Sequence, residues 1–396
     1  MFHPRINLSS DADQTVRVPW TTGFVTPVCT LRCDARTLKS TATIGEATIG
    51  RWSDPLAALE WMSNTFWPGK GRWIGFLSYE LGRLFETLPA PTPDDLNLPL
   101  FVFTYCRPVG ERGNFPEPTY GTSNAPLRSN FTRRDYEAAV AGVIEYIGAG
   151  DVFQVNLSQR FTAGLSIPGA DVYRRLVQRY PAKFGAYLAH EDFALVSNSP
   201  ELFLRITPDQ RIVTRPIKGT RPRQEGMEEE LRNSAKDQAE LNMIVDLERN
   251  DLGRVCTIGS VKVTEPRVIE AHPSVYHGAA TIEGTLRDDV KFVDLLRAVF
   301  PGGSVTGAPK IRAMQIIDEL ETVRRGPYCG AIGYLERDGS MEFSIAIRTI
   351  ILKDGLAHFS VGGGIVADSK PDQEYEETLV KAQALFAALG VTPELH

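Results

Sequence analysis

A lysine stands among arginines in the segment RPIKGTRPR, which runs from Arg215 to Arg223. Neighbouring guanidiniums repel an ammonium and favour its neutral, nucleophilic form, and partial burial acts in the same direction. Lys218 could therefore form a covalent bond to an electrophilic substrate. The segment equally suits an exposed turn in which the arginines and Lys218 all face solvent. Both interpretations stay open at this point.

Two predicted helices each carry a pair of acidic residues three positions apart. Asp237 and Glu240 form one pair, at the edge of an apolar stripe, and Glu374 and Glu377 form the other. Two such helices, if they met, would offer the oxygen ligands that Mg²⁺ prefers. The alternative is a solvated face on each helix, with Glu377 and Lys381 forming only a surface ion pair at i and i+4.

Three further features could hold or protonate an anionic substrate. The glycines from Gly362 to Gly364 follow a predicted strand, where uncovered N–H groups can receive a carboxylate, although a bulge in a sheet suits them equally. His277 also follows a strand-like segment, but a single histidine is more often structural. Glu201 stands at a Ser-Pro turn, as a cap or as a general acid. Together these features suit a small dianion that is bound with Mg²⁺ and attacked by an amine.

The elements that position these residues change character along the chain of 396 residues. Residues 1–125 alternate short strand-like runs with breaker-rich stretches and form an N-terminal β-rich region. Two of these stretches, Pro89–Pro99 and Gly110–Pro126, look like surface connections. A helix is predicted from Thr132, which begins a capping-box-like pattern, to Gly148. Several strand-like runs follow it.

Composition excludes several classes of function. The 43 Lys+Arg and 49 Asp+Glu leave a net charge of -6, and no basic run is interleaved with aromatic residues, so nucleic acid is not an expected partner. No apolar segment approaches the ~18 residues of a membrane span, and the first residues lack a signal core. We expect a cytoplasmic protein with no membrane partner. The five scattered cysteines predict reduced thiols rather than disulfides or a zinc site.

Nine stretches, in this order, resemble the chorismate-utilising family, which includes anthranilate, aminodeoxychorismate, isochorismate and salicylate synthases. They read GDVFQVNLSQRF, SNSPELF, RPIKGTRPR, DLERNDLGRV, PGGSVTGAPKIRAMQIIDELE, GPYCGAIGY, SIAIRT, VGGGIVADSKP and EYEETLVKA. The resemblance implies an anthranilate-synthase-like fold of α/β (α+β) class, with packed, largely antiparallel sheets surrounded by helices. It also implies that residues 126–396 form the chorismate-binding catalytic region, with interleaved halves.

The resemblance implies a role for each matching residue. The catalytic residues are Lys218, the proton-donating Glu201 and His277 near the departing hydroxyl. The Mg²⁺ ligands are Glu240 and Glu377, with Asp237 and Glu374 beside them acting through water. The substrate-binding residues are Arg348, Gly362, Gly363, Gly364, Ser304, Lys381 and Gln154.

Two positions discriminate within the family. Isochorismate and salicylate synthases carry a water-activating lysine where this chain has Gln154, and an amide cannot take that proton. Anthranilate synthases usually read PIAGT at the signature, whereas aminodeoxychorismate synthases read PIKGT, as here with Lys218. The resemblance therefore implies covalent catalysis by Lys218, in which ammonia replaces the C4 hydroxyl of chorismate on the way to 4-aminobenzoate and folate.

The ammonia source is not visible in the sequence, which lacks a glutaminase-type Cys nucleophile with a matching His-x-Glu. The resemblance therefore implies a separate glutamine amidotransferase subunit as partner. Two alternatives remain open. One is component I of an anthranilate synthase, and the other is an inactive scaffold that binds a glutaminase.

Overall fold

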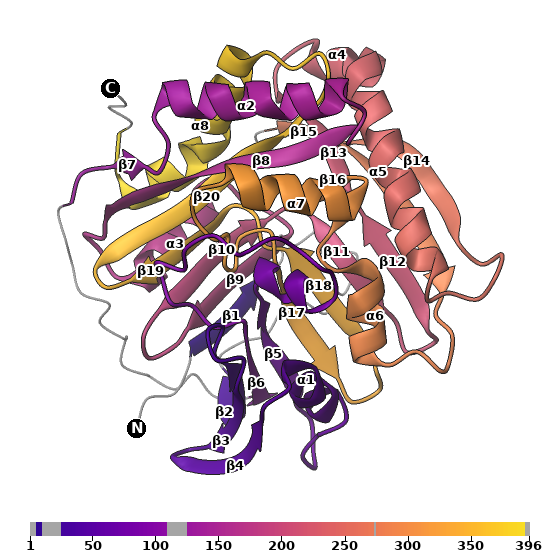
Figure 1. Cartoon of the computed structure of the whole chain (residues 1–396). Coiled ribbons are helices and arrows are strands. Elements are labelled where there is room, and N and C mark those ends of the chain that lie inside the picture. Colours follow the sequence, from indigo (N-terminus) through magenta and orange to yellow (C-terminus); the bar gives the residue numbers. More distant parts are fainter. Residues whose placement is uncertain (1–4, 10–24, 109–124, 273–274, 393–396) are drawn as a thin grey trace.

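Two β-sheets packed against each other, with helices around them, make up the molecule (Figure 1). The structure, a computed structural model, describes residues 5–9, 25–108, 125–272 and 275–392. The predicted connection Gly110–Pro126 lies outside them except for its last two residues, while Pro89–Pro99 is an irregular connection as predicted. All pairs of neighbouring strands are antiparallel within the described residues, which confirms the predicted fold class.

The smaller sheet has eight described strands. In order across the sheet they are β1 (Arg5–Ser9), β9 (Phe184–Ala189), β10 (Ala194–Ser199), β19 (Thr349–Lys353), β20 (Leu356–Ile365), β8 (Gln154–Gly164) and β16 (Gly307–Ala308), with β7 (Arg128–Ser129) also on β8. β8 and β20 are the longest pair, in register from Leu356 opposite Gly164 to Ile365 opposite Val155. This pair carries Gln154 and the three glycines predicted to bind substrate.

The larger sheet has twelve described strands and combines early and late parts of the sequence. In order they are β13 (Ile217–Pro222), β15 (Val275–Thr285), β12 (Arg211–Arg215), β11 (Leu202–Ile206), β18 (Met341–Ile345), β17 (Ala331–Glu336), β5 (Arg72–Leu77), β6 (Phe101–Pro108), β2 (Val25–Cys33), β3 (Ser40–Ile44) and β4 (Ala47–Trp52), with β14 (Lys262–Ala271) on β15. The pairing of β5 with β17 makes the early strands part of the same sheet as β13.

Apolar side chains of the two sheets meet in a shared core. Phe76 and Val102 of the larger sheet belong to one buried cluster with Phe184, Leu188 and Leu195 of the smaller sheet. Burial of these side chains is the main favourable contribution to holding the layers together. The five cysteines are buried and free, as predicted.

Helices cover the outer faces of both sheets. α3 (Gly169–Arg179) and α8 (Pro371–Leu389) pack on the smaller sheet, and α2 (Arg133–Gly148) and α7 (Lys310–Leu320) pack beside them against β8. The larger sheet is covered by α1 (Pro55–Ser63), α5 (Ala235–Gly253) and α6 (Phe292–Val299), with α4 (Met227–Asn233) beside β13. Two short 3₁₀ turns complete the set, η1 (Tyr79–Leu84) and η2 (Gly303–Val305).

The predicted limits of the first of these helices are confirmed at α2. Thr132 caps α2 by accepting a hydrogen bond from the backbone of Asp135 at 3.1 Å, and the helix ends at Gly148. α8 begins at Pro371, a residue suited to the first helical position.

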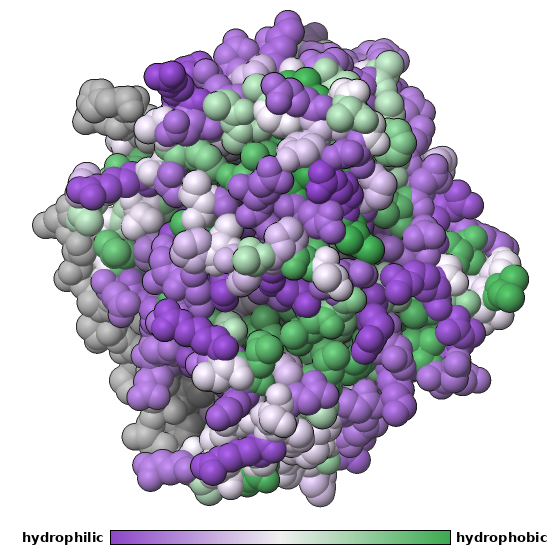
Figure 2. Space-filling model, in the orientation of Figure 1, coloured by the Kyte–Doolittle hydropathy of each residue, from purple (hydrophilic) through white to green (hydrophobic). Residues whose placement is uncertain are grey.

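Hydrophilic side chains cover most of the face shown in Figure 2, and apolar side chains gather below its middle. None of the helices in the described parts of the chain combines the length and apolar character that crossing a membrane needs.

Candidate active site

Lys218 stands in a β-bulge at the edge of the larger sheet. Ile217 pairs with Ala279 and Thr220 with His277, so one extra residue of β13 lies between these two pairs. Gly219 takes the left-handed conformation that such a bulge needs, with φ +81°. A bulge turns the side chains beside it away from the regular alternation of the strand. The glycine of the PIKGT signature therefore sets the direction of Lys218.

The environment of Lys218 favours its neutral form. Its Nζ donates to the backbone oxygen of Ser304 at 3.2 Å. Burial lowers the pKa of the Lys218 ammonium, while the carboxylates of Glu240 and Glu201 act in the opposite direction. A lysine with a lowered pKa is the kind that attacks carbon.

The arginines around Lys218 do not contribute to this effect, contrary to the sequence interpretation. Each one is engaged elsewhere: Arg215 with Glu265 and Glu270, Arg221 with Glu230 and Asp237, and Arg223 with the backbone of His272. The alternative of an exposed turn is also wrong, because Lys218 belongs to a strand and is half-buried. Burial rather than repulsion thus decides its charge.

Glu201 lies between β10 and β11, beside Lys218. Its side chain is 4% exposed, and burial raises the pKa of this carboxyl to about 7, although the Ser304 hydroxyl and Lys218 oppose the shift. No residue of the described chain forms an ion pair with Glu201. A carboxyl that holds its proton near neutral pH can act as a general acid.

Gln154 opens β8 and faces Lys218 across Gly364. Its side chain is fully buried, and neither amide atom has a hydrogen-bond partner among the described residues. A Cβ on Gly364 would lie 2.2 Å from the Gln154 amide nitrogen and 3.4 Å from Lys218 Nζ. Only glycine fits there. Buried amide groups without partners indicate that a ligand completes them.

The three glycines separate two halves of the site. Gly364 faces Lys218, whereas a Cβ on Gly363 would lie 3.1 Å from Glu374 Oε2 and 3.8 Å from Glu377 Oε1, both on α8. β19 pairs with β20 only as far as Phe359, so beyond it one edge of β20 has no strand partner among the described residues. Backbone N–H groups on such an edge can bind an anion.

His277 is on β15, opposite Thr220 of β13, and the charge of Arg348 acts on it. His277 is 2% exposed, its Nδ1 is 2.9 Å from the Thr220 hydroxyl, and burial together with the Arg348 charge lowers its pKa to about 3. Arg348 has a left-handed backbone with φ +49°, an uncommon conformation for arginine. Its guanidinium makes no hydrogen bond or ion pair with the described residues, so it is available to a substrate carboxylate.

On α8, Glu374 and Glu377 differ in their partners. Glu377 Oε1 pairs with Lys381 Nζ at 2.6 Å, and this ammonium also donates to Gly362 O at 2.9 Å. The Lys381 charge lowers the pKa of Glu377. Glu374 accepts a hydrogen bond from the Ser369 hydroxyl at 2.6 Å, and burial raises its pKa. The ion pair expected from the i, i+4 spacing exists, and it stands at the rim of the site.

On α5, Asp237 pairs with Arg221 at 3.0 Å, while Glu240 makes no ion pair or hydrogen bond within the described residues. Burial raises the pKa of Glu240. The charges of Lys218 and Lys236 oppose this shift, and those of Asp237 and Glu374 add to it. Carboxylates on α5 and α8 are thus close enough to repel each other. This donor chemistry fits a hard divalent cation.

Direct coordination by all four acidic groups is not seen. Across the described chain, no three His, Cys, Asp or Glu side chains are close enough together to hold one metal ion. Mg²⁺ keeps several waters in most protein sites, so a set with only one or two direct protein ligands still fits it.

Sequence reasoning missed a second buried carboxyl. Glu248 lies on α5 and is 8% exposed. It stands four residues after Ile244 and four before Leu252, so it interrupts the apolar stripe of this helix. That interruption was the available signal, since a charged residue on a buried face calls for a partner or a proton.

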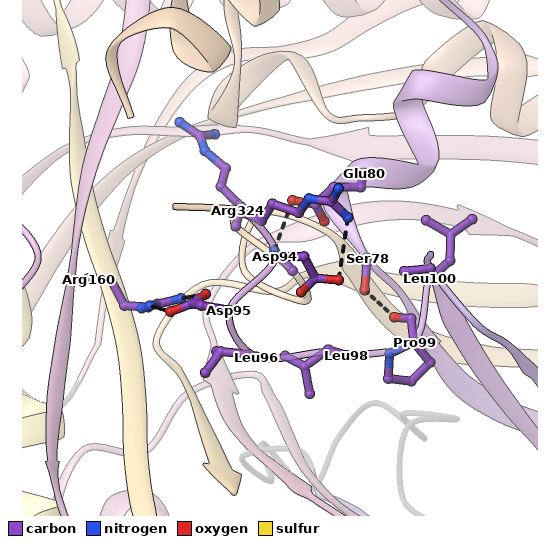
Figure 3. A pocket seen from close by; sticks show the side chains of 13 residues that line it. Ser78, Glu80, Asp94, Asp95, Leu96, Leu98, Pro99, Leu100, Arg160 and Arg324 are labelled. Atoms are coloured by element: carbon purple, nitrogen blue, oxygen red, sulfur yellow. Dashed lines mark hydrogen bonds and ion pairs between the residues drawn. The ribbon is translucent and has the colours of Figure 1, made fainter. Parts of the chain in front are cut away.

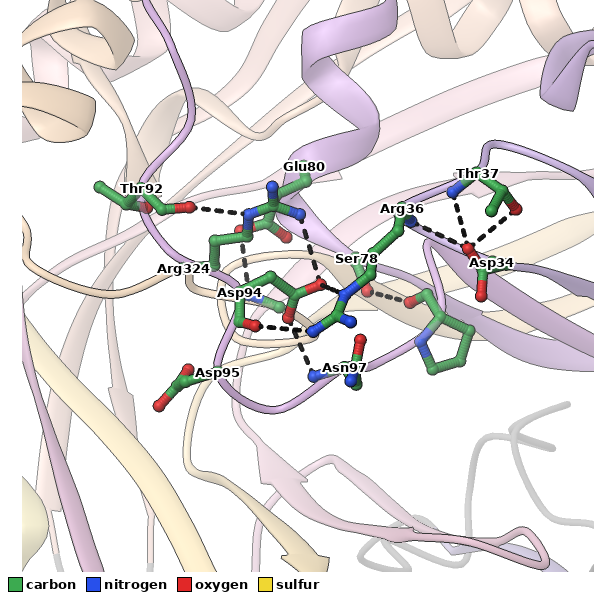
Figure 4. Close-up of polar contacts among 12 residues, drawn as sticks. Asp34, Arg36, Thr37, Ser78, Glu80, Thr92, Asp94, Asp95, Asn97 and Arg324 are labelled. Atoms are coloured by element: carbon green, nitrogen blue, oxygen red, sulfur yellow. Dashed lines mark hydrogen bonds and ion pairs between the residues drawn. The ribbon is translucent and has the colours of Figure 1, made fainter.

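A separate hollow at the loop before β6 is not a second substrate site (Figure 3). Asp95 pairs there with Arg160, and Asp94 with Arg324 at 3.5 Å. About 20 Å³ of free space remains, room for roughly one water molecule. Asp94 also lies 3.8 Å from Arg36 (Figure 4), so these ion pairs fasten the loop to the body of the protein.

Comparison with known proteins agrees with this geometry. Residues 110–387 match the sequence family described as chorismate binding enzyme. The chain belongs to this family. It is therefore a chorismate-utilising enzyme, and the resemblance inferred from its sequence motifs is confirmed.

Relatives with two different names share the same identity with this chain. Aminodeoxychorismate synthase component 1 of Escherichia coli is 40% identical over 402 residues, covering 92% of this chain and 88% of the relative. Anthranilate synthase component 1 of Thermus thermophilus is 40% identical over 361 residues, covering 81% and 78%. The choice between the two reactions therefore depends on the site residues.

The fold has a solved counterpart in the family. The crystal structure of anthranilate synthase component I from Streptococcus pneumoniae superposes with a TM-score of 0.78 at 29% identity, over 96% of this chain and 92% of that one. The predicted anthranilate-synthase-like fold is confirmed.

Proposed function

We propose that this chain is the chorismate-converting component of an aminodeoxychorismate synthase, which replaces the C4 hydroxyl of chorismate by an amino group. The observation that carries the proposal is Lys218. A bulge aims this lysine at Gly364 and Gln154, and burial lowers the pKa of its ammonium. An amine placed in this way can act as a nucleophile, which an alanine in the same position cannot.

The covalent route balances in two displacements. The neutral amine of Lys218 adds to C2 of chorismate, the ring double bonds shift, and the C4–O bond breaks. Glu201 protonates the departing hydroxyl, which leaves as water. Ammonia then adds to C4, the double bonds return, and the bond from C2 to Lys218 breaks. The carboxylate of Glu201 takes the proton that the new ammonium releases, so both residues return to their first state.

Substrate recognition would fall mainly on groups that make no hydrogen bond within the described chain. The Arg348 guanidinium is suited to one carboxylate of chorismate, and the free edge of β20 at Gly362 to Gly364 offers N–H groups to the other. The Gln154 amide and the Ser304 hydroxyl would orient the ring. Lys381 would neutralise charge at the rim, and neutral His277 would contact the departing hydroxyl.

Glu240 and Glu377 would hold Mg²⁺, with Asp237 and Glu374 beside them acting through water. When bound, the ion neutralises the ring carboxylate and so favours addition at C2. The support for this set is the closeness of Glu240 and Glu374, whose charges repel each other and would both be neutralised by a divalent cation. Ammonia would come from a separate glutamine amidotransferase subunit, which fits the name component 1 carried by the relatives.

Anthranilate synthesis is the second candidate, because a relative with that name is also 40% identical to the chain. In that reaction the nitrogen enters at C2 and pyruvate is lost. Lys218 argues against it, since a lysine bonded to C2 blocks this position and directs ammonia to C4.

The test is to identify the product formed from chorismate, Mg²⁺ and ammonium by liquid chromatography with mass detection. The proposal expects a product that retains the enolpyruvyl group and that a lyase converts to 4-aminobenzoate. Anthranilate with pyruvate would establish the second candidate. No turnover, with ammonium or with a glutaminase partner, would indicate an inactive scaffold.

A further inference from the structure

Arg325 is a buried arginine to which the proposed reaction gives no role. It stands between α7 and β17 and is 4% exposed. Glu321, directly after α7, is 5% exposed and accepts hydrogen bonds from Arg325 Nε at 2.9 Å and Nη2 at 2.6 Å. The ring of Tyr79 lies 4.7 Å from the central carbon of the guanidinium. A guanidinium held along one edge by a carboxylate and on one face by a ring has a fixed orientation.

The same guanidinium joins two elements of the site. Its Nη1 donates to Val305 O in η2 at 2.8 Å, and its Nη2 donates to Asn156 O in β8 at 2.6 Å. The carboxylate of Glu321 is bound to β8 as well, because its Oε1 accepts from the backbone N–H of Ser158 at 2.9 Å and from the hydroxyl of Ser158 at 2.8 Å. The buried ion pair therefore fastens η2 to β8, the strand that begins at Gln154.

The turn η2 carries the oxygen that receives Lys218. Lys218 Nζ donates to Ser304 O at 3.2 Å, and Ser304 directly precedes Val305 in the chain. The turn begins with Gly303, where a Cβ would lie 2.8 Å from Leu247 Cδ2. Glycine permits this close packing but leaves the backbone free to adopt other conformations. A turn of this kind needs an anchor from outside, and the guanidinium supplies one at the residue next to Ser304.

We infer that Arg325 is a positioning residue for catalysis, which holds η2 against β8 and thereby orients the amine of Lys218. The inference rests on the proposed function, in which this amine is the nucleophile. An amine that donates an N–H to Ser304 O points its lone pair away from that oxygen. If η2 moves, the lone pair moves with it. A displacement of about 1 Å at a reacting group can lower the rate about 10²-fold.

The first test compares Arg325→Met with the double variant Glu321→Gln/Arg325→Met. The single variant leaves the Glu321 carboxylate buried without its cation, which is strongly destabilising, whereas the double variant removes both charges. The double variant should therefore unfold at a higher denaturant concentration than the single variant. Its kcat should nevertheless stay about 10²-fold below the native value, with KM for chorismate nearly unchanged, because η2 still lacks its anchor. Recovery of kcat together with stability would mean a purely structural role and would overturn the inference.

Arg325→Lys decides the same question if the methionine variants do not fold. Its ammonium can still pair with Glu321, but it lacks the planar fork that reaches Val305 O and Asn156 O together. We expect a protein that folds and has a kcat lowered about tenfold. Arg324→Lys is the matched control, because the neighbouring Arg324 binds the loop before β6 and has no contact with η2. Its kcat should be native, and a native kcat in Arg325→Lys as well would contradict the positioning role.

Amide hydrogen exchange of the free protein separates this inference from the proposed function. Asn156 N donates to Thr306 O at 2.8 Å, and Thr306 N donates to Gly303 O at 3.3 Å, so both amides report on the turn. In Arg325→Lys and in the double variant they should exchange about tenfold faster or more, while the amides of α3 keep their native rates. This readout needs no turnover. If the native protein makes no aminodeoxychorismate but the exchange changes in this way, the proposed function fails while the anchoring of η2 stands. Native exchange rates at both amides would overturn the anchoring itself.

Discussion

Glutamates on the two sides of β20 have pKa values shifted in opposite directions. Towards the larger sheet, Glu201 and Glu248 form no ion pair within the described residues, and burial raises the pKa of both. On α8, Glu377 is half-exposed and pairs with Lys381 at 2.6 Å, which lowers its pKa. Burial and the presence of a cation, rather than residue type, divide the site into a proton-handling interior and a charge-binding rim.

The largest effect is expected from removing the interior nucleophile. Lys218→Ala should lower kcat for aminodeoxychorismate about 10³-fold or more, because the covalent route is lost. Binding of chorismate with Mg²⁺, measured by calorimetry, should persist. Lys262→Ala, at an exposed lysine on β14, is the matched control and should change neither kcat nor chorismate binding. Near-normal turnover in Lys218→Ala would show that Lys218 is not the nucleophile.

The proton donor comes next. Glu201→Gln should lower kcat about 10²-fold or more, because an amide cannot protonate the leaving hydroxyl. The raised pKa, about 7, means that the donating form is present below that pH and is lost above it. Native activity should therefore fall on the alkaline side, and the residual activity of Glu201→Gln should not. A pH profile of kcat/KM checks this, and an unchanged alkaline limb in the variant would assign the limb to another group.

A smaller effect is expected from the bulge. Gly219→Ala puts a Cβ at φ +81° and within 2.9 Å of Asp237, so Lys218 should be displaced. The free energy of unfolding should fall by about 1–3 kcal/mol, with about a tenfold loss of kcat. Gly226→Ala is the control, since Gly226 has φ +80° and open space around it. Denaturant titration should show a loss of stability in both variants, and turnover should fall only in Gly219→Ala. Equal activity in the two would show that the bulge does not aim the lysine.

The smallest effect on kcat is expected at the rim. Glu377→Gln should raise the Mg²⁺ concentration for half-maximal activity about tenfold and leave kcat at saturating Mg²⁺ nearly unchanged. Glu376→Gln is the control, because Glu376 is exposed and pairs with Arg133 at 2.8 Å. An Mg²⁺ titration of both variants is the measurement. Superimposable curves would mean that Glu377 is a surface residue without a role in Mg²⁺ binding.

Part of the fold could be read from local patterns. Capping chemistry gave the start of α2 at Thr132, and the i, i+3 spacing placed Glu374 and Glu377 on one edge of α8. These features depend on residues close together in the sequence. Motifs of the family then identified Lys218 and Glu201 as members of one site.

The rest depends on partners far away in the chain. The bulge at Lys218 exists only in the pairing of β13 with β15, and the engagement of Arg215 by Glu265 and Glu270 requires β14 to lie alongside. No local pattern contains these distances. The repulsion expected from the arginines failed for this reason, and the burial of Glu248 was missed because its neighbours come from other elements.

The pairing of β5 with β17 has a consequence for how the protein forms. Trp73 lies opposite Leu335, and Leu77 opposite Ala331, so a central contact of the larger sheet joins residues near the two ends of the chain. Contacts between such distant segments make folding slow. During synthesis one edge of β5 has no strand partner until β17 leaves the ribosome. Chaperones that bind unpaired strands would then act on this chain mainly before synthesis is complete.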